Sequence, residues 1–189
     1  LVIYDVTDVA TNRHQLQAAN AQLQQLSRTD RLTGLYNRGH WEESLKGAYA
    51  RHQRYGNATS LVMLDIDHFK QINDTYGHQA GDKVIEEIAR LIHEHVRETD
   101  MAGRYGGEEF GVVLSDTDKT NGWVFAERLR KAVEGLEVLH NGQSIRFTIS
   151  LGVADLSQQS INYAELIAWA DHALFASKKA GRNRVTVYE

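Results

Sequence analysis

The longest apolar run of the chain predicts a buried strand. It reads ATSLVMLDID, residues 58–67, and is apolar at nearly every position before its acidic end. A strand with one wet face alternates apolar and polar residues, so this run predicts a strand covered on both faces. SIRFTISLGVADL, residues 144–156, predicts one long strand, and residues 183–189 a last one. MAGRYGGEEFGVVL, residues 101–114, has two strand-like arms around a Gly-Gly pair and predicts a hairpin.

Helical periodicity marks the segments between these strands. A break at Gly34 precedes a helix with Trp41 and Leu45 on its apolar side, and helices are expected at 84–98, 123–136 and 163–180. Gly181 is expected as the C-cap of the last helix, and Trp123 and Trp169 are expected in the core. The order β-α-β-β-α-β-α-β predicts an α+β fold with a mixed central sheet flanked by helices, close to the ferredoxin-like arrangement.

The amino-terminal part has a different pattern. Residues 1–8 read as a short strand, which is stable only within a larger sheet and therefore predicts the end of a truncated upstream domain. Residues 9–28 are polar and rich in Gln and Ala, with apolar residues seven apart and a polar Asn in the second seam position; the seam is Val9, Asn12, Leu16, Ala19, Leu23 and Leu26. This heptad pattern predicts a dimerising helical stalk, with a lone surface helix as the alternative.

Composition narrows the class of protein. The formal net charge is −4, with 21 basic and 25 acidic residues, which disfavours a nucleic-acid partner. There is no cysteine, so neither a disulfide framework nor a thiolate site is expected. No apolar run reaches the roughly 20 residues that span a bilayer, so we expect no membrane contact by this fragment. The GxxxxGK[ST] and GxSxG motifs are absent, which disfavours a P-loop NTPase or a serine hydrolase.

Carboxylates are expected to converge at one edge of the sheet. Asp65 and Asp67 end the buried strand, and Glu108 and Glu109 lie at the hairpin turn. If the strand pairs with the hairpin, these charges repel unless a multivalent cation or protons offset them. Oxygen ligands without His or Cys favour Mg²⁺ or Mn²⁺, and Gly106–Gly107 leaves room for a ligand. The alternative is that two adjacent glutamates in a turn are solvated surface.

Five motifs in one order carry a resemblance to a known family. They are DRLTGLYNR at 30–38, DIDHFKQIND at 65–74, GHQAGD at 77–82, GGEEF at 106–110 and KKAGRNRV at 178–185. Residues 29–189 thereby resemble the GGDEF-domain diguanylate cyclases, in the GGEEF form of their signature. Residues 1–8, with DVT at 5–7, look like the closing strand of a PAS sensory domain.

The resemblance implies a reaction and a metal site. In that family each domain binds one GTP, and in a homodimer each 3′-hydroxyl attacks the α-phosphate held by the partner, giving cyclic di-GMP and two pyrophosphates. By position, the resemblance assigns two Mg²⁺ (or Mn²⁺) ions per active site to Asp65, the Ile66 carbonyl, Glu108 and Glu109. Gly106 and Gly107 complete the catalytic turn, whereas Asp67 receives no ligand role.

The resemblance also assigns the GTP contacts. Asn73 and Asp82 match the positions that read guanine, since a carboxylate can accept from both guanine N–H groups. The phosphates are assigned to backbone amides of the strand-to-helix turn and to two cations: His68, Phe69, Lys70, Lys178 and Arg182. The alternatives are structural: an acid at a helix N-terminus for Asp82, and cations at a helix C-terminus for Lys178 and Arg182.

A second site is implied by RETD, residues 97–100. It looks like the family's RxxD inhibitory motif, in which Arg97, Asp100 and an arginine at the position of Arg128 bind the product. The alternative is a surface ion pair of about 0–1 kcal/mol.

Two functions stay open: an active cyclase, or a nucleotide-binding effector whose catalysis has decayed. The presence of Asp65, Glu108 and Glu109 favours the enzyme. GTP as substrate implies a cytoplasmic domain, although the parent protein could be tethered to a membrane.

Overall fold

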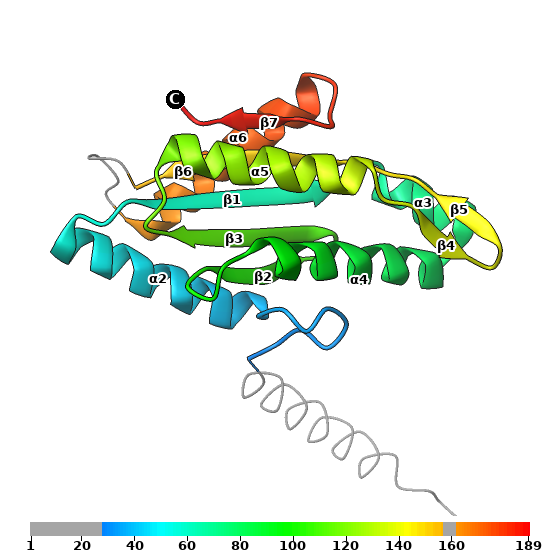
Figure 1. Cartoon of the computed structure of the whole chain (residues 1–189), viewed down its shortest axis with the longest axis horizontal. Helices are drawn as coiled ribbons and strands as arrows, with labels where there is room; N and C mark the ends of the chain where they lie inside the picture. Colours follow the sequence, from blue (N-terminus) through cyan, green and yellow to red (C-terminus); the bar gives the residue numbers. More distant parts are fainter. Residues whose placement is uncertain (1–27, 157–161) are drawn as a thin grey trace, which may run out of the picture.

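The computed structural model describes residues 28–156 and 162–189. These form a five-stranded mixed sheet with helices on both faces, and a separate two-stranded hairpin (Figure 1). The strand order is β2-β3-β1-β6-β7, with bounds β1 Thr59–Ile66, β2 Met101–Gly106, β3 Glu109–Ser115, β6 Ile149–Asp155 and β7 Val185–Val187. All neighbours are antiparallel except β6 and β7, which are parallel. The expected α+β fold with a mixed sheet is confirmed. The strand and stalk expected within residues 1–27 lie outside the described residues.

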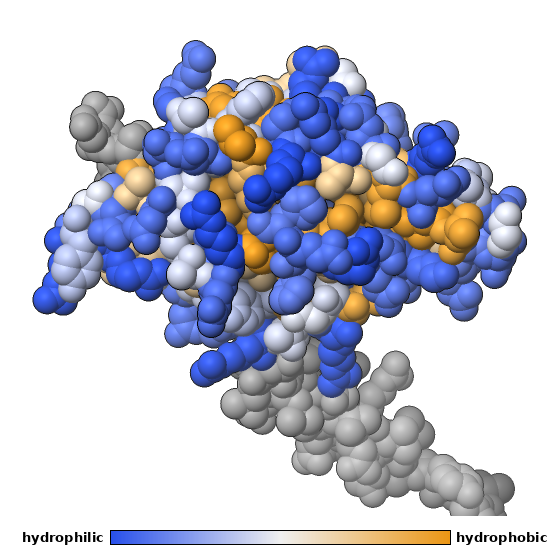
Figure 2. Space-filling model, viewed as in Figure 1, coloured by the Kyte–Doolittle hydropathy of each residue, from blue (hydrophilic) through white to orange (hydrophobic). Residues whose placement is uncertain are grey.

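Helices cover the sheet from both sides. On one face lie α3 (Phe69–Tyr76), α4 (His78–His95) and α5 (Lys119–Glu134), and on the other α2 (Arg38–Tyr55) and α6 (Tyr163–Lys179). Figure 1 shows α4 and α5 in front of the strands and α6 behind them. Hydrophilic side chains cover most of the α4–α5 face, with apolar groups between the helices (Figure 2). Within the described residues, no helix is long and apolar enough to cross a membrane.

Strand β1 lies at the centre of both hydrophobic layers. All eight of its residues are buried, as its continuous apolar run predicts. Val62, Leu64 and Ile66 join the cluster under α4 and α5, whereas Leu61 and Met63 join the cluster with α2 and α6. Because successive side chains of a strand point to opposite faces, β1 is fixed from both sides, and its C-terminal end is held in place.

Glycines allow two helices to approach the sheet closely. Gly103 and Gly111 face each other across β2 and β3, and the Trp41 ring lies against both. A Cβ added to Gly111 would come within 2.3 Å of the Trp41 ring. On the other contact, a Cβ on Gly152 would come within 2.1 Å of the Ala170 carbonyl, so α6 packs directly on the β6 backbone. These contacts hold α2 and α6 against the sheet.

The structure corrects four expected element boundaries. The helix expected at 123–136 is α5, which covers Lys119–Glu134. The single strand expected at 144–156 is wrong: β5 (Gln143–Ile145) pairs with β4 (Val138–His140) in a separate hairpin, and residues 146–148 separate it from β6. The helix expected at 84–98 begins earlier, at His78, because Gly77 (φ 88°) separates it from α3, and it ends at His95. The last strand covers only residues 185–187 of the expected 183–189, because left-handed residues precede it.

Two expectations for single residues are also wrong. The C-cap of α6 is Ala180 rather than Gly181, which follows with a φ of 111° and begins the left-handed turn. Trp123 is 42% exposed, because the first turn of α5 buries Gly122 against Ser60 and leaves the neighbouring side chain outside. Trp169 is partly buried and stacks on Tyr188, with ring centroids 5.3 Å apart.

Candidate active site

The end of β1 lies beside the Gly-Gly-Glu-Glu turn between β2 and β3. The β1–β3 register pairs Asp65 with Glu109, and the Ile66 N–H donates to the Glu108 carbonyl at 3.4 Å. The backbone positions of these acidic residues are therefore adjacent, as the sequence predicts. They meet because β1 and the hairpin are neighbouring strands of one sheet.

Asp65 carries an ion pair that the sequence does not reveal. Its carboxylate lies 2.8 Å from the Lys178 Nζ of α6, and the residue is 8% exposed. Burial raises the pKa of Asp65 above its ordinary value, and the negative charges of Glu108 and Glu109 add to that rise, whereas Lys178 opposes it. The site thus contains carboxylates close enough to affect one another, with one lysine offsetting part of their charge.

The donor set at this edge fits a hard divalent cation. The available groups are carboxylate and carbonyl oxygens, the ligands that Mg²⁺ and Mn²⁺ prefer. Asp65 already pairs with a cation, the Lys178 ammonium. Across residues 28–156 and 162–189, no three His, Cys, Asp or Glu side chains are gathered tightly enough to hold a metal as they stand.

Arg104 holds the turn in place, a role that sequence reasoning missed. Its Nε and Nη2 donate to the Gly107 carbonyl at 2.9 and 2.7 Å, and its Nη1 lies 3.3 Å from Asp30. Asp30 in turn accepts from the Thr33 N–H at 2.9 Å. Gly107 has a φ of 36°, a conformation that favours glycine. An arginine just before a Gly-Gly pair, together with DRLT, was the available signal for this brace.

Asp67 is a structural residue. It is 3% exposed and accepts hydrogen bonds from the Thr148 hydroxyl at 2.6 Å, the Ser150 hydroxyl at 2.7 Å and the Asn183 backbone N–H at 3.0 Å. Ser150 lies on β6, Thr148 directly precedes β6, and Asn183 lies in the loop after α6. The carboxylate therefore joins three segments at the end of β1.

The two residues expected to read guanine lie on neighbouring helices. Asn73 is on α3, and a Cβ added to Gly81 would lie 1.9 Å from its Oδ1, so the side chain packs against the residue before Asp82. The Asn73 Oδ1 is buried without a hydrogen-bond partner, and Asp82 is exposed in the first helical turns of α4. The structure brings these two positions together through Gly81.

The residues expected to bind phosphate come from two elements. His68 caps α3 in a left-handed conformation (φ 58°), and Phe69 and Lys70 begin the helix, whose first N–H groups have no partner within it. Lys178 lies in the last turn of α6 and Arg182 in the loop beyond. A cavity of about 490 Å³ includes His68 and Arg146 in its lining, but not Lys178 or Arg182.

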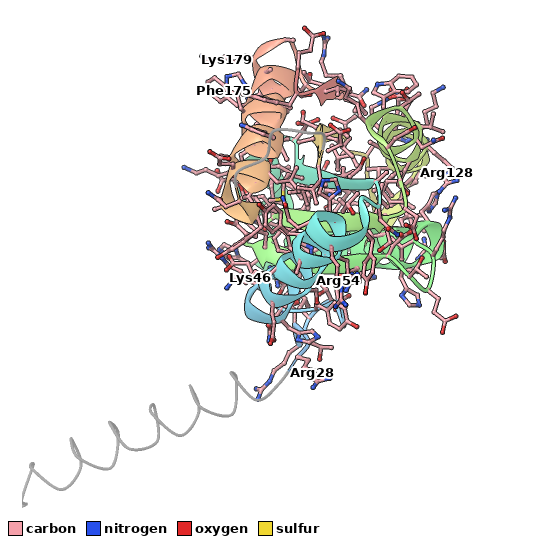
Figure 3. All side chains as sticks on the ribbon, turned by 90° about the vertical axis from the view of Figure 1, so that its left-hand side faces the viewer. Arg28, Lys46, Arg54, Arg128, Phe175 and Lys179 are labelled. Atoms are coloured by element: carbon pink, nitrogen blue, oxygen red, sulfur yellow. The ribbon has the colours of Figure 1, made fainter. Side chains whose placement is uncertain are left out.

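The residues expected to form an inhibitory site share a pocket of about 250 Å³. Arg97, Asp100 and Arg128 all line it. Asp100 is held by the backbone N–H groups of Arg97 at 2.9 Å and Ser115 at 3.1 Å. The Arg128 guanidinium donates to the His95 carbonyl at 3.1 Å. Figure 3 shows Arg128 on the side of the molecule opposite to Phe175 and Lys179 of α6.

Comparison with known proteins identifies the family. Fold and site define an α+β domain that gathers acidic and basic side chains at one end of a mixed sheet. The family described as "Diguanylate cyclase, GGDEF domain" matches residues 27–184. The chain belongs to this GGDEF-domain family of diguanylate cyclases, and the family expected from the sequence is confirmed.

Two relatives, one of them in two solved structures, show the extent of the similarity. "Probable diguanylate cyclase DgcC" of Escherichia coli (strain K12) is 41% identical over 165 residues, which cover 87% of this chain and 44% of that protein. The GGDEF domain of DgcB from Caulobacter crescentus, solved in complex with c-di-GMP, has a TM-score of 0.83 at 36% identity, covering 86% of this chain and 93% of that one. The coiled coil and GGDEF domain of DgcB, also with c-di-GMP, has a TM-score of 0.82 at 32% identity and covers 96% of each chain. The chain spans about half or less of the curated relatives it matches.

Proposed function

We propose that this domain condenses two GTP molecules into cyclic di-GMP with release of two pyrophosphates. Two copies act as a homodimer, each presenting one GTP, so that each 3′-hydroxyl attacks the α-phosphate bound by the partner. Each new P–O bond forms as the bond to pyrophosphate breaks. The observation that carries this proposal is the Gly-Gly-Glu-Glu turn paired in register with Asp65, in a chain of the diguanylate cyclase family.

The acidic edge has a defined role in this proposal. Asp65, the Ile66 carbonyl, Glu108 and Glu109 hold two Mg²⁺ (or Mn²⁺) ions, which when bound neutralise phosphate charge and lower the pKa of a hydroxyl. Gly106 and Gly107 carry no side chain that could exclude the phosphates.

Cationic groups hold the triphosphate in the same proposal. Lys178 leaves Asp65 and, with Arg182, binds the β- and γ-phosphates. The backbone N–H groups at His68, Phe69 and Lys70 bind phosphate oxygens at the start of α3.

Guanine is read by Asn73 and Asp82. The buried, unpartnered Oδ1 of Asn73 supports this role, since a buried polar atom without a partner is costly and a base N–H would satisfy it. The Asp82 carboxylate accepts from the ring N–H and the exocyclic amine of guanine, a pair that adenine lacks. The domain therefore selects GTP over ATP, and it acts in the cytoplasm, where GTP is supplied.

Feedback by the product forms the last part of the proposal. Cyclic di-GMP binds at Arg97, Asp100 and Arg128, and the pocket of about 250 Å³ has room for a base rather than for a whole dinucleotide. Two solved structures of DgcB contain c-di-GMP, which supports product binding in this family.

The test is a product assay with the purified chain. Wild type, Glu108→Gln and Glu98→Gln are incubated with Mg²⁺ and either GTP or ATP, and the products are separated by chromatography. We expect cyclic di-GMP from GTP alone, lost in Glu108→Gln and kept in Glu98→Gln, whose exposed side chain lies outside the site. If no product forms at high protein concentration while cyclic di-GMP binds tightly, the protein is a receptor and the catalytic proposal is wrong.

A further inference from the structure

We propose that Arg130 and Asn183 are positioning residues that hold the loop carrying Arg182 against the end of β1. The role of Arg182 on phosphate rests on the proposed function, whereas the attachment of the loop can be tested without nucleotide. The loop follows α6 and lies beside the C-terminal end of α5 (Figure 1).

Arg130 is a nearly buried cation that bonds to two residues of its own helix and to one residue of the loop after α6. It is 9% exposed, and its Nε and Nη1 donate to Glu127 at 2.8 Å and Glu134 at 3.0 Å, both on α5. The same Nη1 donates to the Asn183 Oδ1 at 2.7 Å. The two glutamates fix the guanidinium, which then fixes the Asn183 side chain.

Asn183 connects α5 to the end of β1. Its Nδ2 donates to Glu134 at 2.7 Å, and its backbone N–H donates to the Asp67 Oδ2 at 3.0 Å. Asp67 is buried and held by Thr148 and Ser150. The result is a continuous series of hydrogen bonds from α5, through Asn183, to the residue two positions after Asp65.

The loop needs this support because its backbone is strained. Arg182 and Asn183 have φ angles of 63° and 46°, in the left-handed region that side chains disfavour. Such conformations persist only where the surroundings over-determine them. The Arg182 N–H donates to the Ser177 carbonyl and the Leu151 N–H to the Arg184 carbonyl, both at 3.0 Å. Asn183 connects the loop to α5 and to Asp67. Without Arg130, the loop relaxes, and Arg182 is no longer held beside the anchored Asn183 at the end of β1.

The protein contains a matched control for Arg130. Arg90 of α4 has the same spacing to two glutamates, with hydrogen bonds to Glu87 at 2.9 Å and Glu94 at 2.6 Å. The Arg90 side chain is 48% exposed, and the two glutamates that it bonds are on α4. Arg130 differs in its additional bond to Asn183 of the loop. Arg90→Met therefore removes the same helical ion pairs without touching the loop.

The first experiment measures hydrogen exchange of residues 181–184 in the protein without nucleotide. In Arg130→Met we expect the Asn183 amide to exchange at least about tenfold faster, with no change in Arg90→Met. Asn183→Ala keeps the backbone N–H and is expected to act like Arg130→Met, which covers the case that the latter folds poorly. If neither Arg130→Met nor Asn183→Ala changes exchange in this loop, the inference is overturned whatever the protein does with GTP.

The second experiment measures turnover of GTP. We expect Arg130→Met to raise the KM about tenfold and to change kcat less than threefold, because phosphate binding is lost rather than the acidic edge. If Arg130 acts through Arg182, the double variant Arg130→Met/Arg182→Ala has the same KM as Arg182→Ala alone. If the double variant instead has a KM raised by the product of the two single effects, Arg130 acts independently of Arg182, and the inference is overturned. Failure of wild type to use GTP would count against the proposed function alone, since exchange still decides the loop.

Discussion

The Lys178 ammonium lies 2.8 Å from the Asp65 carboxylate, so a residue expected to bind phosphate is paired with a residue expected to bind metal. The pair links the two halves of the site. A cation that binds Asp65 competes with Lys178, and a displaced Lys178 is free to meet an anion. Metal and nucleotide binding are therefore expected to be coupled through this contact.

Replacing Lys178 should have opposite effects on metal binding and on GTP binding. In Lys178→Met we expect Mn²⁺ to bind about tenfold tighter without nucleotide, because a charge-assisted bond of roughly 1.5–3 kcal/mol no longer competes. The KM for GTP should rise. Titration of Mn²⁺ by electron paramagnetic resonance measures the first effect, with Lys179→Met as the control. Weaker Mn²⁺ binding in Lys178→Met would contradict this account of the pair.

Gly111 should tolerate no side chain. Gly111→Ala would press a methyl group to within 2.3 Å of the buried Trp41 ring, so we expect a loss of about 1–3 kcal/mol in the free energy of unfolding. The control is Gly47→Ala within α2, where the nearest atom is 3.6 Å away on the Arg51 side chain. There we expect a gain of about 0.5–1 kcal/mol from helix propensity. Urea denaturation measures the free energy of unfolding of both variants. A change of the same sign in the two variants would contradict the packing argument.

Asp30 should contribute stability that depends on pH. Burial alone would raise its pKa, but hydrogen bonds from Thr33 and the charge of Arg104 outweigh it, and the pKa lies below its ordinary value of 3.8. A carboxyl group whose pKa is lowered by folding stabilises the protein at a pH above its pKa in the unfolded state. That stability is lost as the pH falls through its pKa in the folded state. We therefore expect Asp30→Asn to be less stable than wild type at pH 6, with the difference shrinking towards pH 2.5. A difference in urea midpoint that does not vary with pH would count against this linkage.

Asp82 should decide the choice of base. In Asp82→Asn we expect the preference for GTP over ATP, measured as the ratio of kcat/KM values, to fall by roughly tenfold to a hundredfold through loss of hydrogen bonds to a charged acceptor. The control is Glu86→Gln, one turn further along α4 and also exposed. An unchanged ratio with lowered stability would show that Asp82 serves only the helix N-terminus.

Arg97 should be needed for inhibition by the product. Arg97→Ala keeps the backbone N–H that holds Asp100, so the pocket is expected to stay folded. Loss of the guanidinium should weaken inhibition by cyclic di-GMP by at least about tenfold while the KM for GTP stays the same. Steady-state assays with added product measure this, beside Arg90→Ala. Equal inhibition in both variants would leave RETD as a surface turn.

The limits of prediction are clearest in two parts of the fold. The sequence at 144–156 predicted one strand, because nothing in its pattern of polar and apolar residues marks residues 146–148, where the chain passes from the β4–β5 hairpin to the main sheet. Trp123 was expected in the core because it is apolar at a helical spacing, yet Gly122 lets α5 lie so close to Ser60 that the buried positions shift by one. The distance between a helix and the sheet depends on the side chains of both, so the sequence of one segment does not predict it.

The sequence alone determined the family, the central buried strand and the turn with Glu108 and Glu109, because local patterns and motifs encode these directly. Only the tertiary structure decided which charges meet. Lys178 reaches Asp65 because α6 packs on Gly152, Arg104 braces the turn against Asp30, and Arg130 supports Asn183 across two elements. These pairs join residues 53 to 113 positions apart, and their energies depend on distances that exist only after the sheet and helices have packed.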